Sequence, residues 1–342
     1  MSQTEHRPSL VFISWAPFCS RSDGIAKRLG GRSYIIYAPF WGSTYATVWI
    51  KYLVQAVRTL RMLIRDRPKA ILVMSPPVLA CTPVWLYALV TKVTYAIDAH
   101  TAALVDPRWR RVMFIHRFFS RRAVTTIVTN DHLRSIVEAW GAHASIVTDV
   151  PVDFAEPKQT TLKGRCNMTL VSTFTKDEPL NVFFEAAGRV PEVQFYVTGA
   201  YQRAGSRLLQ QKPDNVELTG FLADPDYVGL LTASDAILSL TTLDHTMQRG
   251  AYEAVYLGKP VVTSNFQVLR ESFALGTVHV DNTPDDIARG IRLMRDNLQR
   301  YQNEVLELKR RKLQQWEKRK GELTDLLALS KEAGAAASRT GS

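Results

Sequence analysis

Residues 234–262 read SDAILSLTTLDHTMQRGAYEAVYLGKPVV, and this stretch decides the fold. The apolar run Ala236–Leu240 predicts a strand buried on both faces, as in a parallel sheet. The mostly polar segment Thr241–Gln248 predicts a loop, after which apolar residues recur at helical spacing. Gly258 is a typical helix end, and Val261–Val262 begin the next strand. The stretch therefore predicts the strand–helix–strand unit of an α/β protein.

The loop before this helix is a candidate anion site. Such loops lead into helix N-termini, where free N–H groups and the helix dipole favour negative charge. Thr246, Gln248 and Arg249 lie where they can reach a diphosphate at the helix start; Arg249 alternatively pairs with a surface carboxylate. Further along the helix, the Glu253 carboxylate either accepts hydrogen bonds from sugar hydroxyls or faces solvent.

The segment Glu253–Val262, EAVYLGKPVV, resembles the C-terminal signature of GT-B glycosyltransferases of the family-4, or group 1, type. Family members carry an earlier glutamate as well, and His245 stands in its place here. The resemblance implies that Glu253 holds the nucleotide ribose. It leaves open how the donor sugar is contacted, since His245 is not an acid.

Strands alternate with helices in two successive parts of the chain. The N-terminal part covers residues 1–152 and the C-terminal part covers 167–300, with a polar linker at 153–166. We expect two Rossmann-like domains with parallel sheets. The resemblance implies the GT-B layout, in which an acceptor domain and a nucleotide-sugar-binding domain face a cleft and a last helix, 301–330, returns toward the first domain. The small, polar tail 331–342 is expected to be disordered.

Composition and charge limit the function classes. The chain has 342 residues, 46% of them hydrophobic, which excludes a disordered protein, and its net charge of +11 implies an acidic partner. The three cysteines (Cys19, Cys81, Cys166) fit no metal spacing, and the first residues do not form a signal peptide, so we expect a cytoplasmic protein. The uncharged stretch Ala70–Val90 is long enough to span a bilayer, but its prolines favour a strand followed by a helix.

The second domain opens with a candidate phosphate loop, Ser172–Glu178. Thr173 and Lys176 suit a diphosphate, because hydroxyls and backbone amides cradle it and an ammonium neutralises it. Residues of this loop also suit helix capping. If the loop binds phosphate, the acidic pair Asp177–Glu178 should point away from it.

Two further strand ends of this domain complete the predicted donor site. Gly199 and Tyr201 follow one strand, and Phe221 and Leu222 follow the next. The resemblance implies that both places wrap the nucleotide base through backbone groups, which glycine allows to approach closely.

In the first domain the candidate catalytic residues are Asp98 and His100, at the carboxyl end of the predicted strand Val93–Asp98. Asp98 is the base if the reaction inverts the anomeric configuration. His100 orients the donor sugar if the reaction retains that configuration. The alternative is a capping aspartate beside a partly buried histidine. Ser20 and Arg21 lie in a predicted loop, 20–24, where they either meet an acidic or phosphorylated acceptor or form an ordinary turn.

Two basic segments of the first domain predict contact with an anionic membrane. Lys51–Arg65 lies in an amphipathic helix, Trp49–Ile64, with Leu53 and Val57 on one face. Trp109–Arg122 mixes aromatic and basic residues, which is typical of helices on a membrane surface. The alternative is that these aromatic residues belong to the core and the arginines are solvated.

The favoured function is transfer of a sugar from a UDP-, GDP- or TDP-sugar to a lipid-linked or polysaccharide acceptor. We expect no cofactor and no metal, because loop amides, Lys176 and the helix dipole can stabilise the leaving diphosphate. Localisation would be cytoplasmic, on the inner face of the cell membrane. A nucleic-acid-binding protein stays open on charge, although no such signature is present. A sugar-nucleotide epimerase is disfavoured because His245 replaces a cleft acid, and a non-catalytic scaffold stays open for the same reason.

Overall fold

The computed structural model describes residues 7–39 and 45–329, which form two compact units. Unit 2 comprises Pro151–Gln314, and unit 1 comprises the residues before it together with those from Gln315 onward. The tail predicted at 331–342 lies outside the described residues. The segment predicted as a linker, 153–166, belongs to unit 2, where the amide of Lys158 donates to the carbonyl of Pro225.

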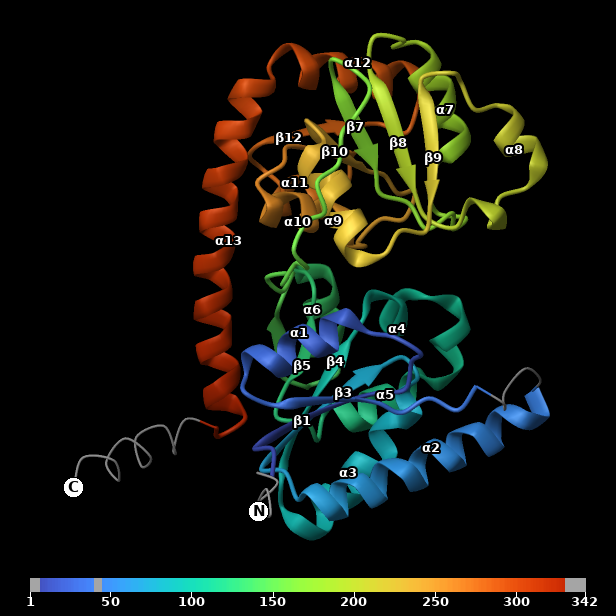
Figure 1. Cartoon of the computed structure of the whole chain (residues 1–342). Coiled ribbons are helices and arrows are strands. Elements are labelled where there is room, and N and C mark those ends of the chain that lie inside the picture. Colours follow the sequence, from blue (N-terminus) through green and yellow to red (C-terminus); the bar gives the residue numbers. More distant parts are fainter. Residues whose placement is uncertain (1–6, 40–44, 330–342) are drawn as a thin grey trace, which may run out of the picture. The chain divides into compact units, whose positions relative to one another are not determined.

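Unit 1 is built on a six-stranded, all-parallel sheet with the order β2-β1-β3-β4-β5-β6. Figure 1 labels β1, β3, β4 and β5 of this sheet. Its strands are β1 (Leu10–Ser14), β2 (Arg32–Ile35), β3 (Ala70–Ser75), β4 (Thr94–Ala99), β5 (Thr126–Val128) and β6 (Ala144–Ile146). Its helices are α1 (Ser20–Arg28), α2 (Tyr45–Asp66), η1 (Val78–Ala80), α3 (Cys81–Thr91), α4 (Thr101–Val105), η2 (Pro107–Val112), α5 (Met113–Ser120) and α6 (Asp131–Ala139).

Both faces of the unit 1 sheet are buried, as expected of a parallel sheet. Along β1, Leu10 and Phe12 pack on the face covered by α1 and by the end of α13. The alternate residues Val11 and Ile13 pack on the opposite face, which α2, α3 and α5 cover. The continuous apolar run of β1 follows from this two-sided burial.

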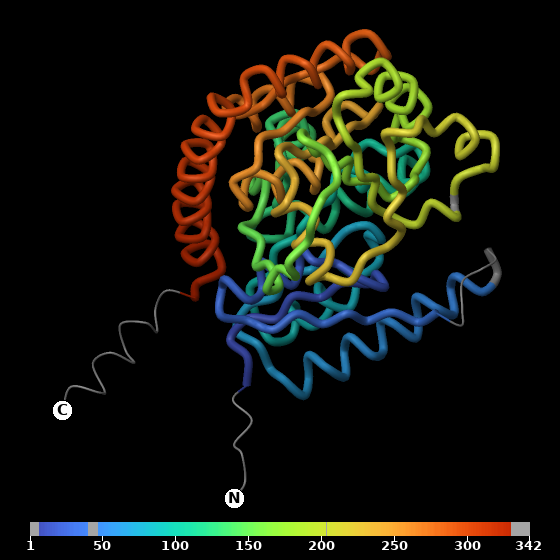
Figure 2. Tube along the Cα trace, turned by 45° about the horizontal axis from the view of Figure 1, so that its top comes forward, coloured from blue at the N-terminus to red at the C-terminus, as the bar shows by residue number. Residues whose placement is uncertain are grey.

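Unit 2 repeats the architecture with a second six-stranded parallel sheet, in the order β12-β11-β10-β7-β8-β9. Its strands are β7 (Asn167–Leu170), β8 (Gln194–Thr198), β9 (Val216–Gly220), β10 (Ala236–Ser239), β11 (Val261–Ser264) and β12 (Thr277–Val280). Its helices are α7 (Leu180–Gly188), η3 (Tyr201–Arg203), α8 (Ser206–Gln210), α9 (Asp224–Ala233), α10 (Arg249–Leu257), α11 (Gln267–Ser272) and α12 (Pro284–Asp296). The long helix α13 (Leu298–Leu326), red in Figure 2, starts in unit 2 and ends in unit 1.

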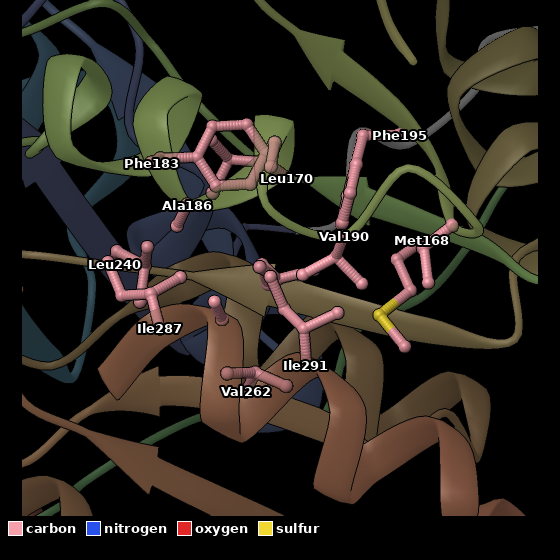
Figure 3. Packing of buried hydrophobic residues seen from close by; sticks show 14 of the residues in the cluster. Met168, Leu170, Phe183, Ala186, Val190, Phe195, Leu240, Val262, Ile287 and Ile291 are labelled. Carbon is pink, nitrogen blue, oxygen red and sulfur yellow. The ribbon is translucent and has the colours of Figure 1, made fainter. Parts of the chain in front are cut away.

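The larger core of unit 2 lies between its sheet and helices α7 and α12 (Figure 3). Phe183 of α7 packs edge-on against Phe195 of β8, with 5.4 Å between ring centroids. Ile291 of α12 belongs to the same cluster as Val262 of β11. On the opposite face, helices α9, α10, α11 and α13 contribute to a second cluster. The sheet therefore holds its strand ends rigidly from both sides.

The predicted α/β fold with two parallel-sheet domains is confirmed, and so is the interpretation of Ala70–Val90 as a strand followed by a helix. No helix within residues 7–39 and 45–329 is long and apolar enough to cross a bilayer. Two local predictions are wrong. Helix α1 begins at Ser20, so residues 20–24 are not a loop. The helix predicted over Trp109–Arg122 divides into η2 and α5.

Candidate active site

The stretch that predicted the fold forms β10, a loop, α10 and β11 of unit 2. Gly258 ends α10 in the left-handed conformation, with φ 73°, which glycine adopts without strain. Gln248 is the residue before the helix, so α10 turns the N–H groups of its first turn toward the preceding loop. The strand, helix and strand of this stretch match their prediction.

Glu253 is buried in unit 2, with 4% of its surface exposed. Tyr227 of α9 donates its hydroxyl to one carboxylate oxygen at 2.7 Å, and Nε of Arg249 donates to the other at 2.5 Å. Burial and the Glu253 charge both raise the pKa of Tyr227 well above its ordinary value. Burial lowers the pKa of Arg249, but the Glu253 carboxylate outweighs it and raises that pKa. The alternative that Glu253 faces solvent is therefore wrong, and Arg249 pairs with a buried carboxylate rather than one on the surface.

The loop between β10 and α10 is tied to the loop after β7. The amide of Thr242 donates to the carbonyl of Asp177 at 2.7 Å. Farther on, His245 has a positive φ of 57°, and its amide donates to the Asp244 carboxylate at 2.7 Å. Thr246 donates its hydroxyl to the Asp244 carbonyl at 3.3 Å. The bond between Thr242 and Asp177 brings the two loops predicted to bind diphosphate together at the carboxyl ends of β7 and β10, and the bonds to Asp244 fix the second loop internally.

Glu178 turns into the loop after β7, so the expectation that it points away is wrong. Its carboxylate accepts hydrogen bonds from the amides of Thr173 and Phe174, both at 2.9 Å, and from the hydroxyl of Ser172 at 2.5 Å. A carboxylate thus occupies the amides that were predicted to cradle phosphate. Lys176 of the same loop is exposed to solvent.

Gly199 brings the ends of three strands together. A side chain at Gly199 would put its Cβ 2.2 Å from the Ser172 carbonyl oxygen, so only glycine fits beside the loop after β7. Its amide donates to the Gly220 carbonyl at 2.9 Å, which joins the ends of β8 and β9. Tyr201 and Leu222 are half-buried beside this junction, and Phe221 is 85% exposed.

In unit 1, Asp98 is buried at the end of β4 with 1% of its side chain exposed. Nε of Arg21, on the first turn of α1, contacts both carboxylate oxygens at 3.1 and 3.2 Å. Arg21 also donates to the Val147 carbonyl at 2.8 Å. Burial raises the pKa of Asp98, but the charge of Arg21 and the contact with His100 hold it below its ordinary value. Asp98 is therefore an ionised carboxylate without access to solvent.

His100 follows β4 and precedes α4, and its Nε2 lies 3.4 Å from Oδ2 of Asp98. Burial lowers the pKa of His100, but hydrogen bonds with Asp98 and Cys19 outweigh it and raise that pKa to about 9. Burial likewise raises the pKa of the Cys19 thiol, and hydrogen bonds from His100 and Ser22 bring it below its ordinary value. At neutral pH the imidazole is consequently protonated, with 35% of its side chain still open to solvent.

Arg21, predicted to meet the acceptor, is instead occupied with Asp98 and is only 14% exposed. Ser20 begins α1 and is half-buried. Sequence reasoning missed Tyr227 and Cys19, because neither lies in a recognisable motif and both meet their partners only through the fold. Within residues 7–39 and 45–329, no group of three or more His, Cys, Asp or Glu side chains is arranged to hold a metal ion.

Comparison with known proteins agrees with this architecture. The family model described as Glycosyl transferases group 1 matches residues 165–297, which include Glu253–Val262. No curated protein sequence matches the chain.

Solved structures share the fold at low sequence identity. Sucrose-phosphate synthase from Thermosynechococcus elongatus is 11% identical with a TM-score of 0.71, over 96% of this chain and 100% of that one. HepE of Anabaena, in complex with UDP and glucose, is 12% identical with a TM-score of 0.71, and the match covers 94% of this chain and 99% of HepE. A glycosyltransferase from Rickettsia africae is 13% identical with a TM-score of 0.68, and the match covers 94% of this chain and 98% of that one. The chain thus has the GT-B fold, and its residues 165–297 are similar to the glycosyl transferases group 1 family.

Proposed function

We propose that this protein transfers a sugar from a nucleotide-sugar donor to a hydroxyl of a lipid-linked or polysaccharide acceptor at a membrane surface. The observation that carries the proposal is the buried Glu253 on α10, beside a helix start at the carboxyl ends of two parallel strands, within a matched glycosyltransferase domain. HepE, which shares the fold, has been crystallised with UDP-glucose, so this donor is the first to test.

In this proposal unit 2 binds the donor. The ribose hydroxyls donate to the Glu253 carboxylate in place of Arg249, and the released guanidinium turns to the diphosphate. Arg249 is suited to this exchange because 47% of its side chain is exposed while the carboxylate it leaves stays buried. The start of α10 and Lys176 add positive charge where the leaving diphosphate develops its own charge.

In unit 1 we assign the direct role to His100. Its imidazolium, which the raised pKa keeps protonated at neutral pH, contacts the transferred sugar with the part of the ring that is open to solvent. Asp98 is ionised but buried against Arg21, so it orients His100 and keeps it protonated rather than acting as a base. Arg21 and Asp98 are positioning residues in this scheme, and His100 is the catalytic residue.

Thermal-shift measurements against UDP-, GDP- and TDP-sugars test donor binding, and a radiolabelled-sugar assay with lipid and glycan acceptors tests transfer. We expect one nucleotide class to raise Tm and the same donor to support turnover. Binding of no nucleotide sugar would refute the proposal.

A second candidate, a non-catalytic protein that binds the nucleotide sugar, is favoured by two observations. His245 replaces the first family glutamate, and Glu178 occupies the amides of the loop after β7. Nucleotide-sugar binding without transfer to any acceptor would support this second candidate.

A further inference from the structure

Helix α2 turns an apolar stripe to solvent in addition to the residues that it packs on the core. Trp49 and Leu53 are each 66% exposed, and Ile64 is 59% exposed. These positions follow one another at helical spacing, together with the partly exposed Val57. The side facing the sheet carries Gln55 and other buried residues. An ordinary surface helix has one apolar stripe, which faces the core, whereas α2 packs Met62 and Leu63 on the core and carries a second apolar stripe on its outer side.

Two neighbouring helices extend this apolar surface. Helices α2, α3 and α5 all cover the same face of the unit 1 sheet, and Trp85 of α3 packs against Phe118 of α5. On α3, Val90 is 84% exposed; on α5, Phe114 is 71% exposed. Both views show α2 as a long, straight helix (Figures 1 and 2). We call this surface the outer face of unit 1; its apolar residues are Trp49, Ile50, Leu53, Val57, Ile64, Leu86, Leu89, Val90, Phe114 and Phe118.

The charge of the outer face is strongly positive. Between residues 45 and 97 the sequence has seven basic residues and a single acidic one, Asp66. That carboxylate is buried and accepts hydrogen bonds from Arg65 and Tyr34, so it adds little negative charge to the surface. Arg58 and Arg61 are exposed beside the apolar stripe.

A hollow of about 600 Å³ adjoins the stripe near the C-terminal ends of α2 and α3. Ile64, Arg67, Lys69 and Tyr87 are among the residues that line it. Cationic and apolar groups therefore meet in one depression. A phosphate-bearing lipid headgroup and the first carbons of its chains present the complementary chemistry.

We propose that the outer face of unit 1 docks on an anionic lipid bilayer, with α2 lying flat in the headgroup layer. Helices that bind in this way carry Trp and aliphatic residues on one side and Lys or Arg around them. Exposed apolar area on this scale marks an interaction surface. A nucleic acid would use the arginines but has no use for the aliphatic stripe, because its affinity comes from phosphate contacts. The inference deepens the proposed function by naming the surface that brings the enzyme to a lipid-linked acceptor.

Flotation of the full-length protein with vesicles, without donor, tests the proposal. One set contains phosphatidylcholine and phosphatidylglycerol, and the other contains phosphatidylcholine alone. We expect binding to the anionic vesicles at low salt and weaker binding at high salt. Leu53→Ser/Ile64→Ser should weaken binding at least about tenfold. Arg58→Ser/Arg61→Ser should weaken it about 30-fold at low salt.

Matched controls on α13 remove similar groups from unit 2. Leu306→Ser removes a side chain that is 57% exposed, and Arg310→Ser/Arg311→Ser removes two exposed arginines. Both should bind vesicles as the unsubstituted protein does, and Tm reports that each variant is folded. A blue shift of tryptophan fluorescence on vesicles that is smaller in Trp49→Phe would place that ring in the interface.

Three results would overturn the inference. The first is no flotation with anionic vesicles at low salt. The second is unchanged flotation of Leu53→Ser/Ile64→Ser. Binding of an oligonucleotide that Arg58→Ser/Arg61→Ser weakens and Leu53→Ser/Ile64→Ser does not would have the same meaning. The third is self-association, seen by sedimentation velocity, that Leu53→Ser/Ile64→Ser abolishes. A protein that floats but transfers no sugar contradicts the transferase proposal alone. One that transfers sugar to a soluble acceptor but does not float contradicts this inference and the membrane location in the proposed function, and leaves sugar transfer standing.

Discussion

Arg21 and Asp98 form a buried ion pair in unit 1, with Nε of the arginine 3.2 Å from Oδ1 and 3.1 Å from Oδ2 of the carboxylate. Asp98 in turn contacts the imidazole of His100. The pair thus fixes a protonated histidine at the end of β4. Its energetic and catalytic consequences can be measured separately.

Breaking the pair from one side should destabilise unit 1. In Arg21→Met the carboxylate of Asp98 stays buried without its cation, which costs about 3–5 kcal/mol. The double variant Arg21→Met/Asp98→Asn should recover much of that loss, and urea unfolding of the four proteins gives the coupling energy. Additive effects of the two substitutions would contradict the pairing.

Acid should weaken the same pair. The folded-state pKa of Asp98 lies below its ordinary value, so its contribution to stability is present above the ordinary carboxyl pKa and is lost as pH falls below it. We expect the acid-induced loss of stability to be smaller in Arg21→Met/Asp98→Asn than in the unsubstituted protein, as followed by circular dichroism.

Replacing His100 by alanine should slow sugar transfer about 100-fold, because a contact that positions the transferred sugar is removed. Binding of the nucleoside diphosphate without its sugar, measured by thermal shift, should stay unchanged because Glu253 and Lys176 lie in unit 2. His132→Ala, an exposed histidine on α6, is the matched control and should retain full activity. Equal rates for the two variants would remove His100 from the mechanism.

The pH profile should report the protonation of His100. Its pKa is raised to about 9 by Asp98 and Cys19 against the effect of burial. The stability that this protonation adds is fully present below the ordinary histidine pKa and is lost as pH rises through about 9. Solvent screens part of this stabilisation by the protonated His100, because about a third of the side chain is exposed.

Transfer should therefore decline above about pH 9, and Asp98→Asn should move the decline to lower pH. NMR titration of the imidazole, with and without that substitution, provides a measurement independent of activity. A pKa that does not respond to Asp98→Asn would disprove the coupling.

Donor affinity should depend on the charge of Glu253. Glu253→Gln weakens the hydrogen bonds to ribose, and we expect a loss of about tenfold or more in the affinity for the nucleotide sugar, measured by calorimetry. Tyr227→Phe is the companion variant, because it removes a partner of Glu253 and keeps the carboxylate. It should cost about 1.5–3 kcal/mol of stability but less donor affinity than Glu253→Gln. A larger affinity loss in Tyr227→Phe would make the role of Glu253 purely structural.

The sequence predicted those features that depend on local pattern. Strand β10 begins at Ala236 as predicted, and α10 ends at Gly258 because the left-handed conformation there favours glycine. Some missed elements also had local signals. Asn130 caps α6 by accepting from the amide of Leu133, and a capping asparagine before an apolar pattern is readable in advance.

Other features could not be predicted because they arise from contacts between distant segments. Cys19 precedes α1 without a side-chain capping bond, so nothing local marked the helix start at Ser20. Arg21 of α1, which pairs with Asp98, lies 77 residues earlier in the chain. The Glu178 carboxylate bonds within its own loop, but no sequence pattern indicates that it turns inward. The exposed stripe of α2 has the same spacing as a buried one, so periodicity alone does not tell which way it faces.

Helix α13 has one more consequence, for how the chain acquires its structure. Trp316, Leu323 and Leu327 belong to the same cluster as Leu10 and Phe12 of β1. A ribosome must therefore synthesise nearly the whole polypeptide before the first domain can complete its interior. A fragment that stops at Val150 would leave that interior open to water and should aggregate. A circular permutant that joins residues 315–329 directly ahead of β1 should fold.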